Sequence, residues 1–92
     1  MHTKSKIYDL INSNLNPIKI DIIDDSDKHV HHKKDTRGGH FRVFVVSDNF
    51  KETSLINRHK LIYEILEKLM KVEIHALSMQ TLTEEEYKEK IK

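Results

Sequence analysis

The stretch from His40 to Leu69 constrains the fold most, because its hydrophobic period changes from that of a strand to that of a helix within a few residues. Apolar residues first recur at every second position, at Phe41, Val43 and Val45. This period is typical of a β-strand whose two faces have different surroundings. Phe44 and Val46 make the second face apolar as well, which favours a central strand with a neighbour on each edge.

A polar turn and a helix follow this strand. Ser47, Asp48 and Asn49 have short side chains that bond to nearby backbone groups, so they end the extended run. Aliphatic residues then recur at helical spacing, at Leu55, Leu61, Ile62, Ile65, Leu66 and Leu69. This pattern predicts one long amphipathic helix that ends near Leu69.

The same two periods assign most of the remaining chain. A helical pattern covers residues 3–14, and this helix ends before Pro17 because the residue that precedes a proline avoids helical dihedrals. Alternating isoleucines predict a strand over residues 18–24. A second alternation that starts at Val72 predicts a third strand after the long helix.

Two further segments complete the pattern. Thr83 and Glu86 have the spacing of a capping box, which predicts a short helix over about residues 84–90. Residues 25–39 lack an apolar period and hold both glycines of the chain. We predict a polar loop there, and a loop of this length in a compact domain is commonly functional.

These elements predict one α/β (α+β) domain over residues 1–92, with the order α-β-β-α-β-α. The two strands that flank the loop are predicted to pair antiparallel, because they are adjacent in sequence. The helical crossover then places the third strand parallel to the central one. The predicted architecture is a three-stranded mixed sheet with helices packed on one face.

Composition restricts the class of function. Charged residues make up 34% of the 92 residues, but the formal net charge of +1 lacks the basic excess of a dedicated nucleic-acid binder. The absence of cysteine excludes disulfides, thiolate nucleophiles and cysteine metal ligands within the chain.

No apolar run approaches the roughly 18 residues that span a bilayer, so we expect a cytoplasmic protein without a membrane partner. Phosphate-binding glycine loops, nucleophile elbows and HExxH motifs are also absent, and we expect no enzymatic activity.

Seven histidines are unusual for so short a chain, and three of them lie together in the loop. These three are His29, His31 and His32. They form either a metal site or a solvated histidine-rich segment with incidental metal affinity. A closed zinc site needs four ligands, and three neighbouring imidazoles in a loop need not converge on one ion.

His75 is the second candidate ligand. We expect the alternating apolar residues of the third strand to face the helices, namely Val72, Ile74 and Ala76. His75 then lies on the uncovered face of the sheet with a ring nitrogen to offer; the alternative is a histidine bonded to a backbone carbonyl. His59, beside Arg58 on the long helix, and His40, at the start of the central strand, are expected to be structural.

The central stretch resembles the BolA family. The resemblance is carried by His40-Phe41, Val45-Val46-Ser47-Asp48, Phe50, Arg58-His59 and His75-Ala76-Leu77. It covers about residues 24–81, and these motifs at these separations are a specific combination. The resemblance implies a compact domain similar to the second class of KH domains. This chain, however, lacks the G-x-x-G loop with which KH domains clamp a nucleic-acid backbone.

The resemblance also implies a partner, a monothiol glutaredoxin, with which such proteins share a [2Fe–2S] cluster. Glutaredoxin contributes its cysteine and a bound glutathione thiol, and the BolA-like chain contributes the histidine of its H-A-L motif, here His75. Residues 24–29 resemble a D-x-S-x-x-H motif, which points to His29 as the second ligand, with His32 and then His31 as alternates. Imidazoles on one iron remove negative charge and raise the reduction potential. The implied function is iron–sulfur cluster trafficking or iron and redox sensing.

Two other functions are open at this point. BolA-like proteins are also associated with DNA-binding transcriptional regulation in stress responses. Arg58, Lys60 and Lys51 are the candidate cations of such a surface, although Glu52 and Glu64 interrupt them. The third hypothesis is metal buffering by the loop histidines alone. When free, the chain is expected to be a monomer or a weak homodimer.

Overall fold

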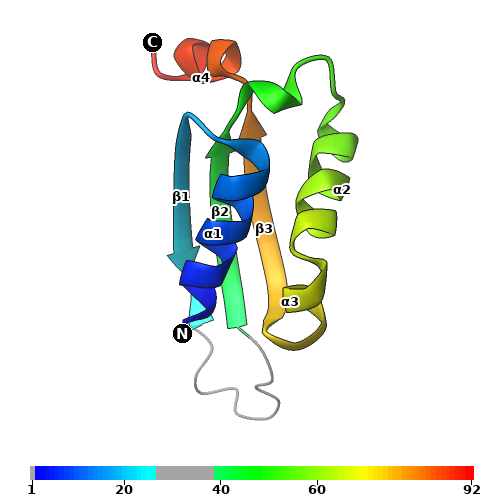
Figure 1. Ribbon diagram of the computed structural model, residues 1–92. Helices are drawn as coiled ribbons and strands as arrows, with labels where there is room; N and C mark the ends of the chain where they lie inside the picture. The colour runs from blue at the N-terminus through cyan, green and yellow to red at the C-terminus, as the bar shows by residue number, and fades with distance from the viewer. Residues whose placement is uncertain (1, 27–38) are drawn as a thin grey trace.

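The computed structural model describes residues 2–26 and 39–92, which fold around a three-stranded sheet (Figure 1). In chain order the elements are α1 (Thr3–Leu15), β1 (Lys19–Asp24), β2 (Gly39–Val46), the 3-10 turn η2 (Asp48–Phe50), α2 (Leu55–Ile65), α3 (Glu67–Val72), β3 (Ile74–Leu82) and α4 (Glu84–Lys90). Strand β2 is central, antiparallel to β1 and parallel to β3. The predicted mixed sheet, its central strand and both strand directions are therefore confirmed.

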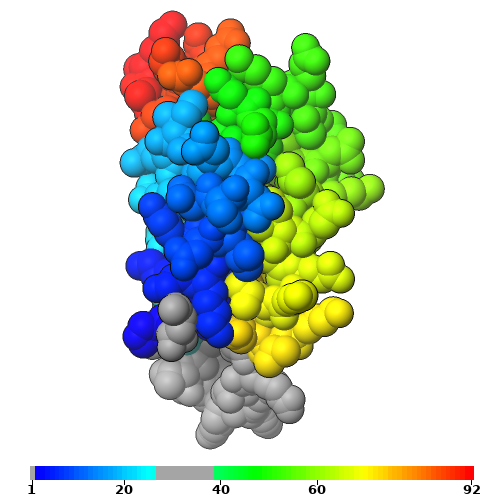
Figure 2. All heavy atoms as spheres, viewed as in Figure 1, coloured from blue at the N-terminus to red at the C-terminus, as the bar shows by residue number. Residues whose placement is uncertain are grey.

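Helices α1, α2 and α3 pack on one face of this sheet (Figure 1). In the space-filling view α1 lies beside α2 and α3, and their side chains cover that face (Figure 2). Buried residues alternate along β2, at Phe41, Val43 and Val45, and Ile22 of β1 is buried beside them. Fully buried helix residues meet them from the other side, at Ile7, Ile11 and Ile62. The short α4 lies at the end of the sheet where β2 and β3 finish (Figure 1). Within the described ranges no helix has the length and apolarity to cross a membrane.

The single long helix that the sequence predicts is divided at Leu66, whose backbone leaves the helical region (φ −98°, ψ 11°). Helix α3 then continues to Val72, because the amide of Glu73 still donates to the carbonyl of Leu69 (2.8 Å). Val72 is 70% exposed, so the expectation that it starts the third strand and faces the helices is wrong. Strand β3 begins at Ile74 instead, and a short apolar alternation cannot distinguish the two cases.

Hydrogen bonds of the buried Ser47 and the exposed Asp48 hold the end of the sheet near α4. The hydroxyl of Ser47 donates to the carbonyl of Leu15 (2.9 Å) and accepts from the amide of Asn49 (3.1 Å). The carboxylate of Asp48 accepts from the amide of Glu84 at the start of α4 (3.1 Å). These bonds connect α1, η2 and α4, so Ser47 and Asp48 of the BolA-like sequence motif have a structural role.

Arg58 in α2 is buried at the same end, with 6% of its surface exposed. Its Nε donates to the carbonyl of Thr53 (2.9 Å), and Nη1 donates to the carbonyl of Thr81 (3.0 Å). The two terminal nitrogens also donate to the two carboxylate oxygens of Glu86 (2.7 and 3.1 Å). The guanidinium lies 5.7 Å from the ring centroid of Phe50. Because the side chain is buried and bonded internally, the expectation that Arg58 belongs to a partner or nucleic-acid surface is wrong.

Glu86 connects this arginine to the start of α4. Its Oε1 accepts from the amide of Thr83 (2.9 Å), and the Thr83 hydroxyl accepts from the amide of Glu86 (3.2 Å), which confirms the predicted capping box. The Arg58 guanidinium first, and the Thr83 amide second, lower the pKa of Glu86 from 4.5 to about 2. The carboxylate therefore remains ionised well into the acid range.

We predict that this carboxylate contributes to the acid dependence of stability. Because its folded-state pKa is depressed, its contribution is fully present above about pH 4.5 and is lost as the pH falls toward 2. The Glu86 side chain is 45% exposed, so solvent screening keeps the gain below that of a buried pair. An NMR titration should give Glu86 a midpoint near 2, and Glu86→Gln should flatten the acid limb of the unfolding free energy. Glu85→Gln on the exposed surface is the control, and a Glu86 midpoint near 4.5 would contradict the pairing.

Candidate functional site

A β-bulge near the start of β3 positions His75. Gly39 lies opposite Ile74, but the next residue of β2, His40, lies opposite Ala76. His75 is therefore the extra residue of the ladder, without a partner across it. A bulge bends its strand and re-aims side chains, and bulges are common beside functional sites.

The bulge also decides which face the following residues share. Leu77 lies opposite the buried Phe41 and packs against the core, so Ala76 before it lies on the uncovered face. The expectation that Ala76 faces the helices is wrong, because one inserted residue shifts the alternation. His75 is exposed on the uncovered face, as predicted. Ile74, just before it, faces the core and has only 3% of its surface exposed.

The ring of His40 lies beside the ring of His75. The ring centroids are 5.2 Å apart, and the ring planes are inclined by 44°. His40 is half-buried and His75 is exposed. Within residues 2–26 and 39–92 the imidazole of His75 makes no hydrogen bond, so no backbone carbonyl in that part of the chain occupies it. Both strands that carry these rings begin at the end of the molecule where the N-terminus lies (Figure 1).

Residues at the base of the long loop hold the backbone of His40. Its amide donates to the hydroxyl of Ser26 (3.1 Å), and its carbonyl accepts from the amide of Asp25 (2.8 Å). Hydrogen bonds from Ser26 to the carboxylate of Asp24 keep the pKa of that group below its usual value. The carboxylate of Asp25 accepts from Nε of Arg42 (2.7 Å). Asp25 and Ser26 therefore fix the start of β2, and Asp24 in turn bonds to Ser26.

Gly39 precedes His40 at a position with no room for a side chain. A Cβ there would lie 2.6 Å from Oγ of Ser26 and 2.8 Å from Cε2 of Phe41. We predict that Gly39→Ala lowers the free energy of unfolding by about 1–3 kcal/mol, because one of these neighbours must move. Urea denaturation measures the change, with Ser78→Ala on the exposed surface as the control. Unchanged stability would contradict this close approach of backbone to side chain.

The carboxylate nearest in sequence to His75 is already paired. Glu73 accepts two hydrogen bonds from Nζ of Lys6 (2.9 and 3.1 Å) and one from the hydroxyl of Thr3 (2.8 Å). These bonds, that of Lys6 first, lower the pKa of Glu73. Among the described residues no group of three or more His, Cys, Asp or Glu side chains could hold a metal ion. The two imidazoles are therefore an incomplete donor set within that part of the chain.

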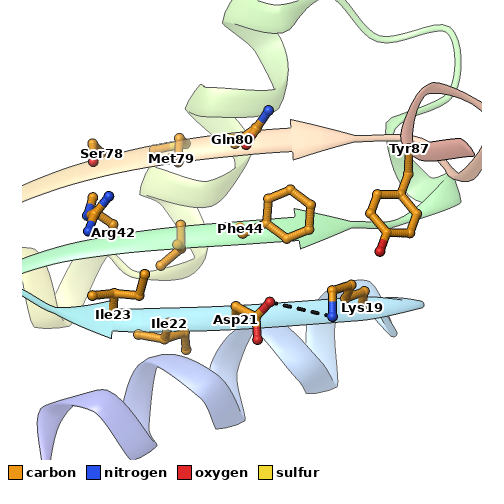
Figure 3. Close-up of a pocket in the computed structure, with 11 residues that line it drawn as sticks. Lys19, Asp21, Ile22, Ile23, Arg42, Phe44, Ser78, Met79, Gln80 and Tyr87 are labelled. Carbon is orange, nitrogen blue, oxygen red and sulfur yellow. Dashed lines mark ion pairs between the residues drawn. The ribbon is translucent and has the colours of Figure 1, made fainter. Parts of the chain in front are cut away.

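The uncovered face carries a hollow of about 670 Å³ (Figure 3). Residues of all three strands line it, including Lys19, Asp21, Ile23, Arg42, Phe44, Ser78 and Gln80. Tyr87 of α4 closes one end, with its ring centroid 5.9 Å from that of Phe44. Each cation of the hollow has an acidic neighbour, since Lys19 lies 3.6 Å from Asp21 and Arg42 bonds to Asp25. The hollow thus combines apolar surface with balanced charge.

The remaining candidate residues either fall outside the described part of the chain or lie elsewhere in it. The loop histidines fall outside the described residues and stay predictions: His29, His31 and His32. His59 is half-buried in α2, and its structural role also stays a prediction. Lys51 and Lys60 are exposed, and the Nζ of Lys51 lies 3.6 Å from the carboxylate of Asp48.

Known proteins share this sequence pattern and this fold. The family model described as BolA-like protein matches residues 11–86. The chain belongs to the BolA family. An uncharacterized protein of Buchnera aphidicola is 38% identical over 88 residues, which cover 96% of this BolA-family chain and 83% of that protein. The DNA-binding transcriptional regulator BolA of Escherichia coli is 29% identical over 87 residues, or 95% of this chain and 81% of the regulator. The solved BolA domain of SufE1 from Arabidopsis thaliana has a TM-score of 0.82 at 33% identity, covering 94% of this chain and 98% of that domain.

The contact between the rings of His40 and His75 was not predicted from the sequence of this BolA-family chain. A signal was present, because parallel neighbouring strands start at the same edge of a sheet and each of these has a histidine at its second position. The bulge that brings the rings together has no comparable signal, since it depends on the register between two distant segments.

Proposed function

We propose that this chain is a non-enzymatic iron–sulfur adaptor that binds a monothiol glutaredoxin and shares a [2Fe–2S] cluster with it. One observation carries the proposal: the exposed imidazole of His75 lies on a bulge, on the sheet face that α1, α2 and α3 leave open. Within the described residues this ring has no hydrogen-bond partner, so it is free to ligate a metal. Membership in the BolA family supports the same partner.

The donor set of the chain fits a cluster completed by another protein. The chain has no cysteine, so its contribution is imidazole rather than thiolate. Imidazoles replace thiolates on one iron in some [2Fe–2S] centres and raise the reduction potential. The cluster supplies one-electron chemistry and transferable iron and sulfide, while His75 holds and orients it. The second ligand inferred from the resemblance, His29 with His32 and His31 as alternates, stays a prediction.

The uncovered face also offers a partner a contact surface on the same side of the sheet as the ligand. Ile23 is 46% exposed there, and the rings of Phe44 and Tyr87 line the same hollow. The paired charges around them avoid a large field of one sign. A mixture of aromatic, apolar and balanced polar groups is typical of a non-obligate protein interface.

Reconstitution with glutaredoxin tests the proposal. The purified chain is combined with a monothiol glutaredoxin, glutathione, iron and sulfide, and then separated by size-exclusion chromatography. We expect a heterodimer whose visible absorption differs from that of cluster-loaded glutaredoxin alone, because the ligands of one iron change. Omission of glutathione is the control. The proposal is wrong if the chain elutes separately and the glutaredoxin spectrum is unchanged.

DNA-binding transcriptional regulation is the second candidate, and the name of the Escherichia coli relative favours it. The charges of this chain support it less. Arg58 is buried, Lys51 has an acidic neighbour, and the net charge is only +1. Binding through phosphates weakens steeply as salt is added. An electrophoretic titration at two salt concentrations tests this candidate, and affinity without salt dependence would remove it.

A further inference from the structure

We propose that His40 and His75 together form a bidentate imidazole site for one metal ion, so that His40 is the second ligand from this chain. The site requires only these two described residues, whose rings are already neighbours. Where the metal is cluster iron, the inference rests on the proposed function. The chemistry of the site itself is that of a borderline transition-metal ion such as Zn²⁺, Fe²⁺ or Cu²⁺, which imidazole prefers over calcium or magnesium.

The spacing of the rings fits a shared metal. At the usual metal–nitrogen distance of about 2 Å, two imidazoles on a tetrahedral metal hold their ring centroids roughly 5 Å apart. The centroids of His40 and His75 are 5.2 Å apart. Their planes are inclined by 44°, which is neither a parallel stack nor a perpendicular edge contact. The distance between the rings is therefore the one that a common metal ion requires.

The backbones that carry the two rings are fixed before any metal binds. The backbone of His40 is bonded to Ser26 and Asp25. On the β3 side, the amide of Gly39 donates to the carbonyl of Glu73 (2.9 Å) just before the bulge. Fixed backbones leave little conformational entropy to lose on binding, so a pair of ligands placed in this way binds more tightly than two mobile histidines.

The neighbouring carboxylates are held by cations and do not compete for the metal. Glu73 is bonded to Lys6 and Thr3, and Asp25 is bonded to Arg42. The two imidazoles are thus the donors that this end of the uncovered face presents. The positions that they leave on the metal are to be filled by a partner or by water, as in sites that keep open coordination positions.

A metal titration without glutaredoxin tests the site directly. The probe is Zn²⁺, added to a nitrogen-15-labelled chain in which the loop histidines are replaced by glutamine: His29→Gln, His31→Gln and His32→Gln. We expect the first equivalent of Zn²⁺ to shift the imidazole nitrogen signals of His40 and His75 together. His40→Gln should weaken binding at His75 by more than the roughly 10- to 100-fold that is typical of losing an outer-shell partner.

Two further variants keep this titration decisive. Glutamine at position 40 preserves the bonds to Ser26 and Asp25, because the backbone of His40 makes them. The reciprocal variant His75→Gln should abolish the shift at His40. His59→Gln, on α2, is the matched control and should leave the titration unchanged. Equal Zn²⁺ affinity at His75 with and without His40 would overturn the inference.

The glutaredoxin complex separates this inference from the proposed function. A cluster that survives replacement of the three loop histidines and is lost with His40→Gln supports both. A cluster that survives His40→Gln and is lost with the loop replacements overturns the role of His40 and leaves the adaptor function standing. If the native chain forms no shared cluster, the adaptor function fails, and the Zn²⁺ titration still decides whether His40 and His75 form a metal site.

Discussion

Replacing Arg58 with alanine is expected to lower the free energy of unfolding by about 3 kcal/mol, which is roughly a 15 °C fall in melting temperature for a domain of this size. Without the guanidinium, the carbonyls of Thr53 and Thr81 lose the donor that Arg58 provides, and the bond to Thr81 is a buried one. Each orphaned buried acceptor costs about 1–3 kcal/mol. The carboxylate of Glu86 adds less, because its 45% exposed side chain can be solvated. Thermal and urea unfolding measure the effect.

The exposed Lys60 on the same helix supplies the control. Lys60→Ala is expected to change stability by no more than about 0.5 kcal/mol. Arg58→Lys should fall between the two, because a single ammonium cannot reproduce the bidentate pair with Glu86 and both carbonyl bonds. If Arg58→Ala were as stable as the native chain, the structural role assigned to Arg58 would be contradicted.

Replacing His75 with alanine is expected to remove the histidine-ligated cluster from the glutaredoxin complex while leaving the fold intact. The side chain is exposed and bonds to no described residue, so the free energy of unfolding should change by no more than about 0.5 kcal/mol. The cluster should suffer a much larger loss, because a direct ligand disappears rather than an outer-shell partner. Visible absorption and circular dichroism of the reconstituted complex measure the loss.

His59→Ala makes the same chemical change on the opposite layer of the molecule, in α2. It should leave the cluster spectrum unchanged, so any general effect of losing a histidine is subtracted. A cluster spectrum that keeps every feature in His75→Ala, with native stability, would remove His75 from the site.

The order of elements could be predicted because each period spans enough residues to average out local ambiguity. The alternation from Phe41 to Val45 and the capping box of Thr83 and Glu86 are both observed as predicted. The parallel pairing of β2 with β3 follows from the handedness of crossover connections. These features depend on local chemistry or on general topology, so the sequence contains them.

Features that depend on register or burial could not be predicted in the same way. Alternation alone placed Val72 in a strand and Ala76 against the helices, whereas one hydrogen bond extends α3 and one bulge shifts β3. Arg58 reads as a surface cation in sequence, yet its partners Thr81 and Glu86 are more than 20 residues away along the chain. The contact between His40 and His75 has the same origin, since it exists only once β2 and β3 are paired.

Pulsed EPR of the reduced glutaredoxin complex tests whether an imidazole of this chain is bonded to the cluster. The chain is labelled with nitrogen-15 in its histidines only, and the glutaredoxin is unlabelled, so any nitrogen-15 coupling to the cluster comes from an imidazole of this chain. We predict a nitrogen-15 coupling of the size of a directly bonded imidazole, and the part that belongs to His75 should disappear in His75→Ala. A shared cluster without any nitrogen-15 coupling would contradict the claim that this chain ligates it through histidine.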